Sequence, residues 1–136
     1  MVREIVHDPL FLAQRSAEAK ESDMQIAIDL IDTLRANLDR CVGMAANMIG
    51  QRKRIIAMAK GPMVVAMMNP KILTRSGEYE AEEGCLSLEG TRKTKRYRSI
   101  RLQWQDVQMK THVGTLDGFQ AQIVQHEIDH CDGILI

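Results

Sequence analysis

A pair of histidines near the end of the chain places the strongest constraint on how this sequence can fold. His126 and His130 frame the pattern His-Glu-x-x-His. On a helix, residues four positions apart lie on the same face, so both imidazoles can reach one metal ion. Catalytic metal sites commonly use three protein ligands and leave one position open. Because the sequence ends at Ile136, soon after His130, we expect the third ligand to come from an upstream segment that folds back against this helix.

Glu127, inside the same pattern, suits the role of a general base. A carboxylate beside a metal ion can take a proton from a water molecule that the ion activates. The alternative is a structural helix whose histidines only pair with neighbouring groups. Ile123 and Ile128 predict that the helix is partly buried, and buried polar groups need partners. This favours a metal site.

Cys85 is the upstream residue best suited to be the third ligand. A thiolate with two imidazoles leaves one position open on a four-coordinate ion. A bound ion would also deprotonate the thiol at neutral pH. Taken alone, Cys85 has an ordinary alternative as a small buried apolar residue. This ligand set suits Fe²⁺, Zn²⁺, Ni²⁺ and Co²⁺, so the residues themselves do not choose the metal.

Composition excludes several function classes. The chain has 136 residues, the size of one domain, and we expect a single domain over residues 1–136. The 18 basic and 18 acidic residues balance, which argues against a nucleic-acid partner. No run is long and apolar enough to span a membrane, and no secretory signal opens the sequence. With three widely spaced cysteines, a disulfide framework is not expected, so we predict a cytoplasmic protein.

The spacing of apolar residues predicts a helix, several strands and a second helix. Residues 22–39 are the first helix, opened by a capping box at Ser22. Strands are predicted over 55–59, 63–68, 97–104 and 107–113, with Asn69-Pro70 ending the second of them. Residues 114–118 form a loop before a helix over 119–131. The basic run 92–98 is interpreted as a solvated strand or loop rather than a polyanion site. This order predicts an α+β fold.

Three stretches together resemble the motifs of the peptide deformylases, in order and in spacing. That family carries G-x-G-x-A-A-x-Q, then E-G-C-L-S, then Q-H-E-x-D-H. This chain has CVGMAANM at 41–48, EGCLS at 83–87 and QHEIDH at 125–130, so the second and third motifs match fully. The resemblance covers nearly the whole chain. It implies antiparallel sheets packed around a C-terminal metal-binding helix.

The family removes the formyl group from the N-terminal formyl-methionine of new polypeptides. The resemblance implies that Cys85, His126 and His130 bind one divalent metal ion, with Fe²⁺ expected and Zn²⁺, Ni²⁺ or Co²⁺ as substitutes. Glu127 would take a proton from water and pass it to the leaving amine. The backbone N–H of Leu86 would help to hold the oxyanion. The implied partners are N-formyl-methionyl nascent peptides, met near the ribosome, with no membrane or nucleic acid involved.

Substrate contacts are implied at Gly43, whose backbone would pair with the peptide as an added strand, and at Arg92. Gly43 has an alternative role in close packing alone. Met48 stands where the family has a Gln that donates to the oxyanion, and a thioether cannot donate. The loss of such a donor typically lowers the rate by about 10²–10³. Asn47 would point to the opposite face if this segment is extended. Cys41 replaces a Gly of the motif, and this replacement would restrict the backbone if that position needs a positive φ.

Three functions follow, in order of preference. The first is a working peptide deformylase, of full or reduced activity, because Glu127 and all three ligands are present. The second is a deformylase-like paralogue with weak or no turnover that binds metal and peptide, which Met48 and Cys41 favour. The third is a metallohydrolase for a different acyl substrate, because the changes in the first motif fall where substrate would lie.

Overall fold

The computed structural model describes all 136 residues, and its elements follow the predicted order of helix, strands and helix. The helices are α1 (Pro9–Leu12), α2 (Met24–Ala36) and α3 (Gly118–Cys131), with two short 3₁₀-helices, η1 (Glu21–Asp23) and η2 (Ala46–Ile49). The strands are β1 (Gly43–Ala45), β2 (Ile55–Lys60), β3 (Met63–Cys85), β4 (Leu88–Gln105) and β5 (Thr111–Asp117). The α+β prediction is confirmed.

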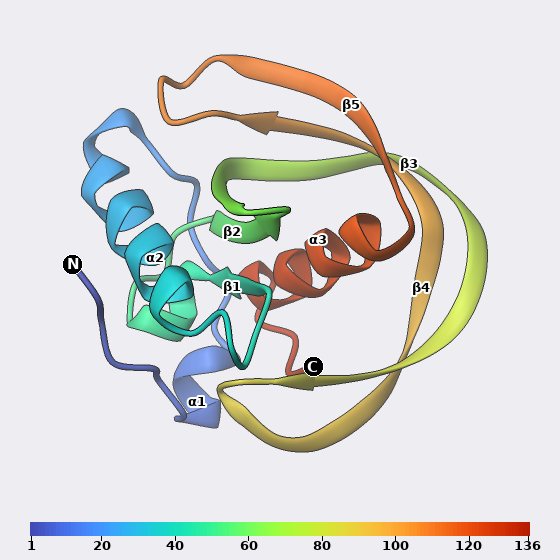
Figure 1. Cartoon of the computed structure of the whole chain (residues 1–136), viewed down its shortest axis with the longest axis horizontal. Helices are drawn as coiled ribbons and strands as arrows, with labels where there is room; N and C mark the ends of the chain where they lie inside the picture. The colour runs from blue at the N-terminus through green and yellow to red at the C-terminus, as the bar shows by residue number, and fades with distance from the viewer.

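All five strands join one antiparallel sheet in the order β1-β2-β3-β4-β5. The long strands β3 and β4 curve around α3, on the side away from α2 (Figure 1). β2 pairs with β3 only over residues 63–68, whereas residues 71–85 of β3 pair only with β4. The outer edge of β1 and one edge of the second half of β3 are therefore left without a strand partner.

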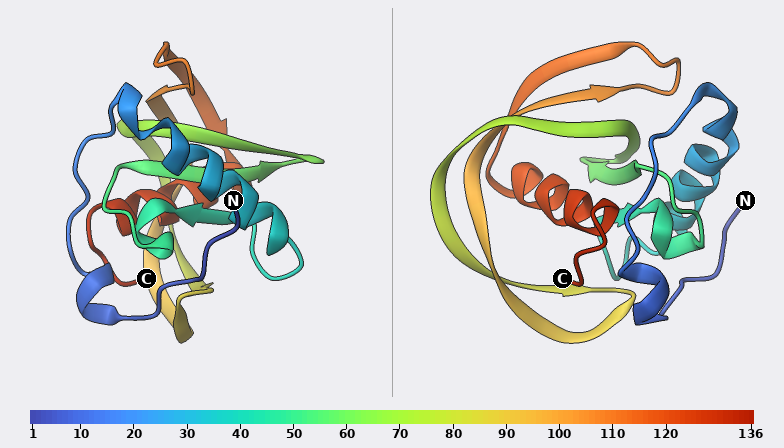
Figure 2. Two further views of the ribbon diagram at one scale, coloured as in Figure 1. Left: turned by 90° about the vertical axis from the view of Figure 1, so that its left-hand side faces the viewer. Right: turned by 180° about the vertical axis from the view of Figure 1, so that it is seen from behind.

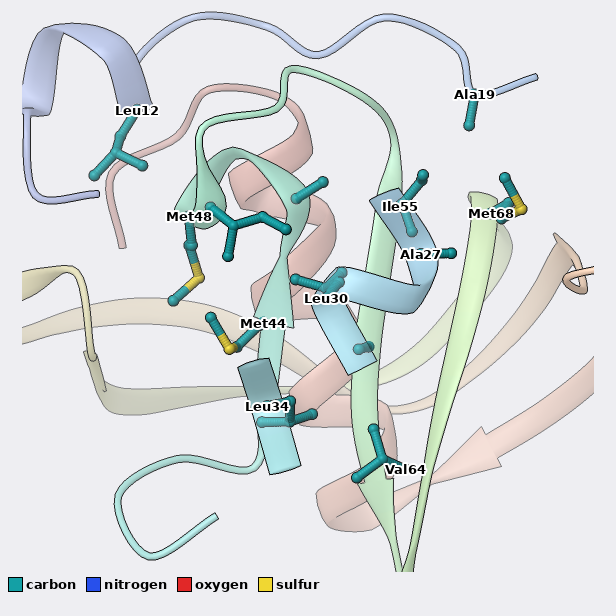
Figure 3. Packing of buried hydrophobic residues seen from close by; sticks show 13 residues of the cluster. Leu12, Ala19, Ala27, Leu30, Leu34, Met44, Met48, Ile55, Val64 and Met68 are labelled. Carbon is teal, nitrogen blue, oxygen red and sulfur yellow. The ribbon is translucent and has the colours of Figure 1, made fainter. Parts of the chain in front are cut away.

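The apolar core has two parts because alternate residues of a strand face opposite sides of a sheet. On β2, Ile55 and Ala57 face α2, while Ile56 and Met58 face α3. Figure 3 shows the first cluster, in which Leu30 and Leu34 of α2 pack near Met44, Met48 and Val64. The second cluster joins α3 to β4. The rear view in Figure 2 shows α3 enclosed by the curved sheet. The helix that carries the histidines is thus fixed from several sides.

The prediction that Asn69-Pro70 ends a strand is wrong, because β3 continues through it to Cys85. Asn69 has a φ of 51°, and the register shifts between Met68 and Lys71, so the strand bends here without ending. Asn tolerates this left-handed backbone better than most residues. Its side chain compensates for the interrupted pairing by bonding to the backbone of Ala19 at 2.7 and 2.9 Å.

Other boundaries also differ from the prediction. Residues 114–117 belong to β5, because they pair with β4 from Leu102 to Ser99, and the turn lies earlier, between Gln105 and Thr111. The first helix begins at Met24 and ends at Ala36, three residues early. Ser22 does not cap it, since the short helix η1 precedes it and Asp23 Oδ2 accepts the bond from Lys20 N.

The basic run forms part of β4, as the strand interpretation predicted. It lies opposite the acidic residues of β3, with Glu82 paired to Lys93 and Glu80 to Lys95 in the register. These cross-strand charges compensate one another, so the run is not a free basic surface. None of the helices is long and apolar enough to cross a lipid bilayer.

Candidate active site

The structure brings the three expected metal ligands together from two distant parts of the chain. Cys85 ends β3, while His126 and His130 lie one turn apart on α3. Cys85 Sγ lies 3.3 Å from His130 Nε2, which lies 3.1 Å from His126 Nε2. One sulfur and two imidazole nitrogens within 4.8 Å of one another form a donor set. These spacings fit bonds of about 2.0–2.3 Å to a common tetrahedral centre.

Local structure explains how each ligand is placed. Cys85 pairs with Leu88 across a tight turn, and the register shift between Gly84 and Cys85 turns the thiol toward α3. The end of α3 is held by Asn47, whose Nδ2 donates to the carbonyl of His130 at 3.0 Å. Both histidines are buried. The ligand positions therefore depend on the packing of the hairpin and the helix, not on flexible loops.

A positive charge is favoured at the centre of the three donors. Burial lowers the pKa of His126, but its bonds to the Cys85 thiol and the Glu83 carboxylate outweigh burial and raise the pKa to about 10. Burial, together with the charge on His126, lowers the pKa of His130 to about 3, so that imidazole is neutral and able to bind a cation. A metal ion supplies the same positive charge in place of a proton.

A buried network around Glu83 orients the first histidine. Glu83 Oε1 lies 2.9 Å from His126 Nδ1 and accepts a bond of 2.7 Å from Arg96 Nη2. Gln122 donates to the other carboxylate oxygen at 2.8 Å, and Arg96 also reaches Asp129 at 2.7 Å. Although burial raises the pKa of Glu83, these bonds outweigh it and lower the pKa to about 2. The ionised carboxylate thus leaves His126 Nε2 directed toward the other donors.

This supporting network is what the sequence interpretation missed. Glu83 and Asp129 lie inside the two motifs that match fully, yet only their neighbours were given a role. The signal in the sequence is that each of these motifs contains an acidic residue, Glu83 or Asp129, to which neither metal binding nor proton transfer is assigned. Arg96 carried no such signal, because it looked like one more member of the basic run.

Glu127 directly follows His126 on α3. Its side chain is buried, and its Oε1 has no hydrogen-bond partner. Burial raises the pKa of Glu127 to about 7, with His126 opposing and Glu83 adding to the shift. A group with a pKa near neutrality can both accept and return a proton under ordinary conditions.

A cavity of about 580 Å³ opens beside these residues. One wall is formed by residues 40–43, which lead into β1, and the other by residues 82–86 at the end of β3. The third wall is α3, with Phe119, Gln122, Ile123, His126 and Glu127. The cavity therefore lies between the segment that leads into β1 and the edge of β3 that lacks a strand partner.

The sequence model of the polypeptide deformylases matches residues 2–136. The chain belongs to this family. It is 53% identical to a peptide deformylase of Clostridium beijerinckii over 136 residues, which cover all of both chains. It is 36% identical to a peptide deformylase of Dictyoglomus thermophilum, covering all of this chain and 91% of that one. These relatives are metal-dependent hydrolases, and the recognition made from the three motifs is confirmed.

Solved deformylase structures have the same fold. The crystal structure of peptide deformylase from Thermotoga maritima superimposes with a TM-score of 0.88 at 30% identity, covering 99% of this chain and 95% of that one. A class I type b peptide deformylase from Acinetobacter baumannii, described as bound to Met-Ala-Ser, gives 0.87 at 28% identity and covers 99% and 97%. The α+β architecture with the helix inside the antiparallel sheet is therefore the deformylase fold.

Gly43 lies directly against Glu127 and Ile123 of α3. A Cβ atom at this position would lie 2.7 Å from Ile123 Cγ2 and 2.8 Å from Glu127 Oε2. Any side chain here would push against Glu127 or Ile123. Only Gly fits at this position, because Ile123 and Glu127 lie too close to allow a side chain. The backbone of Gly43 lines the cavity.

The first motif differs in detail from what its sequence suggested. Residues 46–49 form a 3₁₀-helix and not an extended segment, so Asn47 turns toward the end of α3. Cys41 does not have a positive φ, so the replacement of Gly does not strain the backbone there. Met48 is buried in the core, its sulfur accepting from Ala45 N at 3.5 Å, and it is not among the cavity-lining residues.

Arg92 lies on β4, in the β3–β4 hairpin that carries Cys85, but does not line the cavity. Its Nη2 donates to the carbonyl of Glu89 at 3.2 Å, and its Nη1 is buried without a partner. Leu86 lines the cavity next to Cys85, as its expected role requires.

Because the Glu83 carboxylate orients the ring of His126, we predict that Glu83→Gln weakens metal binding. Loss of a carboxylate that orients a metal-binding histidine typically costs 10- to 100-fold, so the affinity for Co²⁺ should fall by about that factor. Competition with a chelating dye measures it. The matched control is Glu82→Gln, whose carboxylate is exposed and bonded to Thr91.

Equal Co²⁺ affinities in the two variants would contradict this role of Glu83. Because Glu83→Gln leaves the buried charge of Arg96 without its main partner, circular dichroism must first show that the variant is folded. If it is not, Glu83→Gln combined with Arg96→Met removes both charges and permits the same measurement.

Proposed function

We propose that this chain is a working peptide deformylase that removes the formyl group from formyl-methionyl peptides. The observation that carries the proposal is the convergence of Cys85, His126 and His130 on one point, with Glu127 beside them at the end of a peptide-sized groove. The second motif supplies the thiol and the third motif both imidazoles and the base. A paralogue that only bound metal and peptide would need the three ligands but not Glu127.

Cys85, His126 and His130 are the proposed ligands of one divalent ion. Ferrous iron is the ion we assign, with zinc, nickel or cobalt as substitutes, because a mixed sulfur and nitrogen donor set accepts all four. When bound, the ion polarises the formyl carbonyl and makes a water molecule more acidic. Glu83 keeps the ring of His126 in the orientation that this binding requires.

Glu127 is the proposed proton carrier. It accepts the proton of the attacking water at its free carboxylate oxygen and then donates it to the amine of the departing methionine. Its pKa of about 7, which burial raises, suits both steps near neutral pH. The backbone N–H of Leu86 is the proposed donor to the oxygen of the tetrahedral intermediate, where charge develops.

The peptide itself is proposed to add as a strand between β1 and the end of β3. Residues 40–43 and 82–85 both run from the mouth of the groove toward the ligands. Met44, Ala45 and Ala46 beyond Gly43 are completely buried, so the peptide can leave only toward residue 40. With its formyl end at the ligands, the peptide is therefore antiparallel to both walls. Arg92, with a free buried nitrogen near the hairpin, is the proposed further contact.

We also propose that the protein acts in the cytosol, on nascent chains near the ribosome. Formylated N-termini arise only during synthesis, so a deformylase must meet its substrates there. Three cysteines without disulfides agree with a reducing compartment.

The direct test is turnover of formyl-Met-Ala-Ser by protein purified without oxygen and loaded with Fe²⁺, or with Ni²⁺ or Co²⁺. We expect deformylation that Glu127→Ala reduces by at least 100-fold, because this variant removes the proton carrier. Metal content, measured on the same samples, should be equal in both proteins. Turnover no higher than that of Glu127→Ala, with metal bound, would contradict the proposal and favour a paralogue that only binds peptide.

Met48 is the residue that we propose limits the rate. A Gln in its place could accept from the Ala45 N–H through its carbonyl oxygen, as the Met48 sulfur does, and keep its NH₂ group for the substrate oxygen. Met48→Gln should raise kcat at least about tenfold, because one oxyanion donor is worth more than that. Met48→Leu, which supplies no donor, is the control. An unchanged kcat in Met48→Gln would show that the missing donor is not the limiting defect.

A further inference from the structure

Two charged residues stand at the mouth of the groove, one on each wall. Arg40 precedes β1 and Glu82 lies near the end of β3, and both are exposed and line the cavity. Further in, Glu83 is neutralised by Arg96, and Glu127 belongs to the chemistry. Arg40 and Glu82 are therefore the charges nearest to the part of a bound peptide that extends outward from the ligands.

Neither of these two charges takes part in an ion pair, but Glu82 has a cationic cross-strand neighbour. The Glu82 carboxylate accepts a 2.6 Å bond from the Thr91 hydroxyl and faces Lys93 across the β3–β4 pair. Arg40 takes part in no ion pair, and its only side-chain bond is to the neutral amide of Asn37. The groove mouth thus presents an uncompensated positive charge on the β1 wall.

The direction of the peptide sets which of its residues reaches that charge. If the formylated residue lies opposite Gly43, an antiparallel strand places its second, third and fourth residues progressively toward Arg40. Arg40 lies three positions outward from Gly43, in the turn that precedes β1, so counting outward brings the fourth residue of the peptide nearest to it and the third residue next. The third and fourth residues of the peptide are therefore the ones nearest to Arg40, whereas the first two residues lie against the deeper walls.

We propose that Arg40 gives this enzyme a preference for peptides with an acidic side chain at the third or fourth residue. The inference rests on the proposed function, since it assigns a selectivity to the same groove. Arg40 acts on binding and not on the bond that breaks, so the preference is expected mainly in KM. An exposed ion pair typically changes an equilibrium about two- to fivefold, and salt weakens it.

The test uses four formylated tetrapeptides, all with amidated C-termini so that no terminal carboxylate competes. Formyl-Met-Ala-Glu-Ser is compared with formyl-Met-Ala-Lys-Ser, and formyl-Met-Ala-Ser-Glu with formyl-Met-Ala-Ser-Lys. We expect kcat/KM to be about two- to fivefold higher for Glu in at least one pair at low salt. The ratio should fall toward one in 0.5 M salt and should invert in Arg40→Glu.

Arg35→Glu is the matched control, because it makes the same change in net charge at an exposed position outside the cavity. An inverted ratio in Arg40→Glu but not in Arg35→Glu supports the proposal. A ratio of one at both positions in the wild type, or the same response in both variants, would overturn it. Turnover of uncharged formyl-Met-Ala-Ser distinguishes failure of the proposed function from failure of the role of Arg40. No turnover of this peptide would contradict the proposed function itself. Turnover of this peptide without a charge preference among the tetrapeptides would contradict only the role of Arg40.

Discussion

The carboxylate of Glu83 joins the hairpin that carries Cys85 to the helix that carries both histidines. It lies 2.9 Å from His126 and accepts bonds from Arg96 and Gln122, all in a largely buried position. Two ligands on one helix are automatically neighbours, but the third comes from residues more than forty positions earlier in the chain. A buried charge is costly unless it is fully paired, so this network tolerates little change in the distance between hairpin and helix. The donor set depends on it.

The second constraint is the long, bent strand β3. Because its backbone continues through Asn69 and Pro70, the strand leaves β2 and carries the hairpin around α3 (Figure 1). The same bend leaves the second half of β3 without a partner on the side that faces β1. The groove is thus a consequence of sheet topology: two open edges, with the floor supplied by the helix. The Asn-Pro pair, which resembles a strand end in the sequence, is thus the bend that leaves this edge of β3 open.

The convergence of Cys85, His126 and His130 and the α+β class could be predicted from the sequence because their signals are local. A four-residue spacing fixes two imidazoles on one helical face, and a Gly-Cys turn offers a thiol. Residues whose role depends on long-range partners could not be predicted. Arg96 looked like part of a basic strand until Glu83 and Asp129 were found beside it. Asn69 looked like a breaker, because its compensating bonds reach back fifty residues to Ala19. The direction of the Asn47 side chain could not be predicted, because the 3₁₀-helix that turns it toward α3 has no apolar periodicity in the sequence.

The central claim is that one thiolate and two imidazoles form the complete set of protein ligands. X-ray absorption at the metal edge of the cobalt-loaded protein tests it most directly, because sulfur and nitrogen neighbours are distinguished by distance. We predict one sulfur at about 2.3 Å and two imidazole nitrogens at about 2.0–2.1 Å, with the sulfur lost in Cys85→Ser. A spectrum without sulfur, or with a second sulfur contributed by Cys41, would contradict the account.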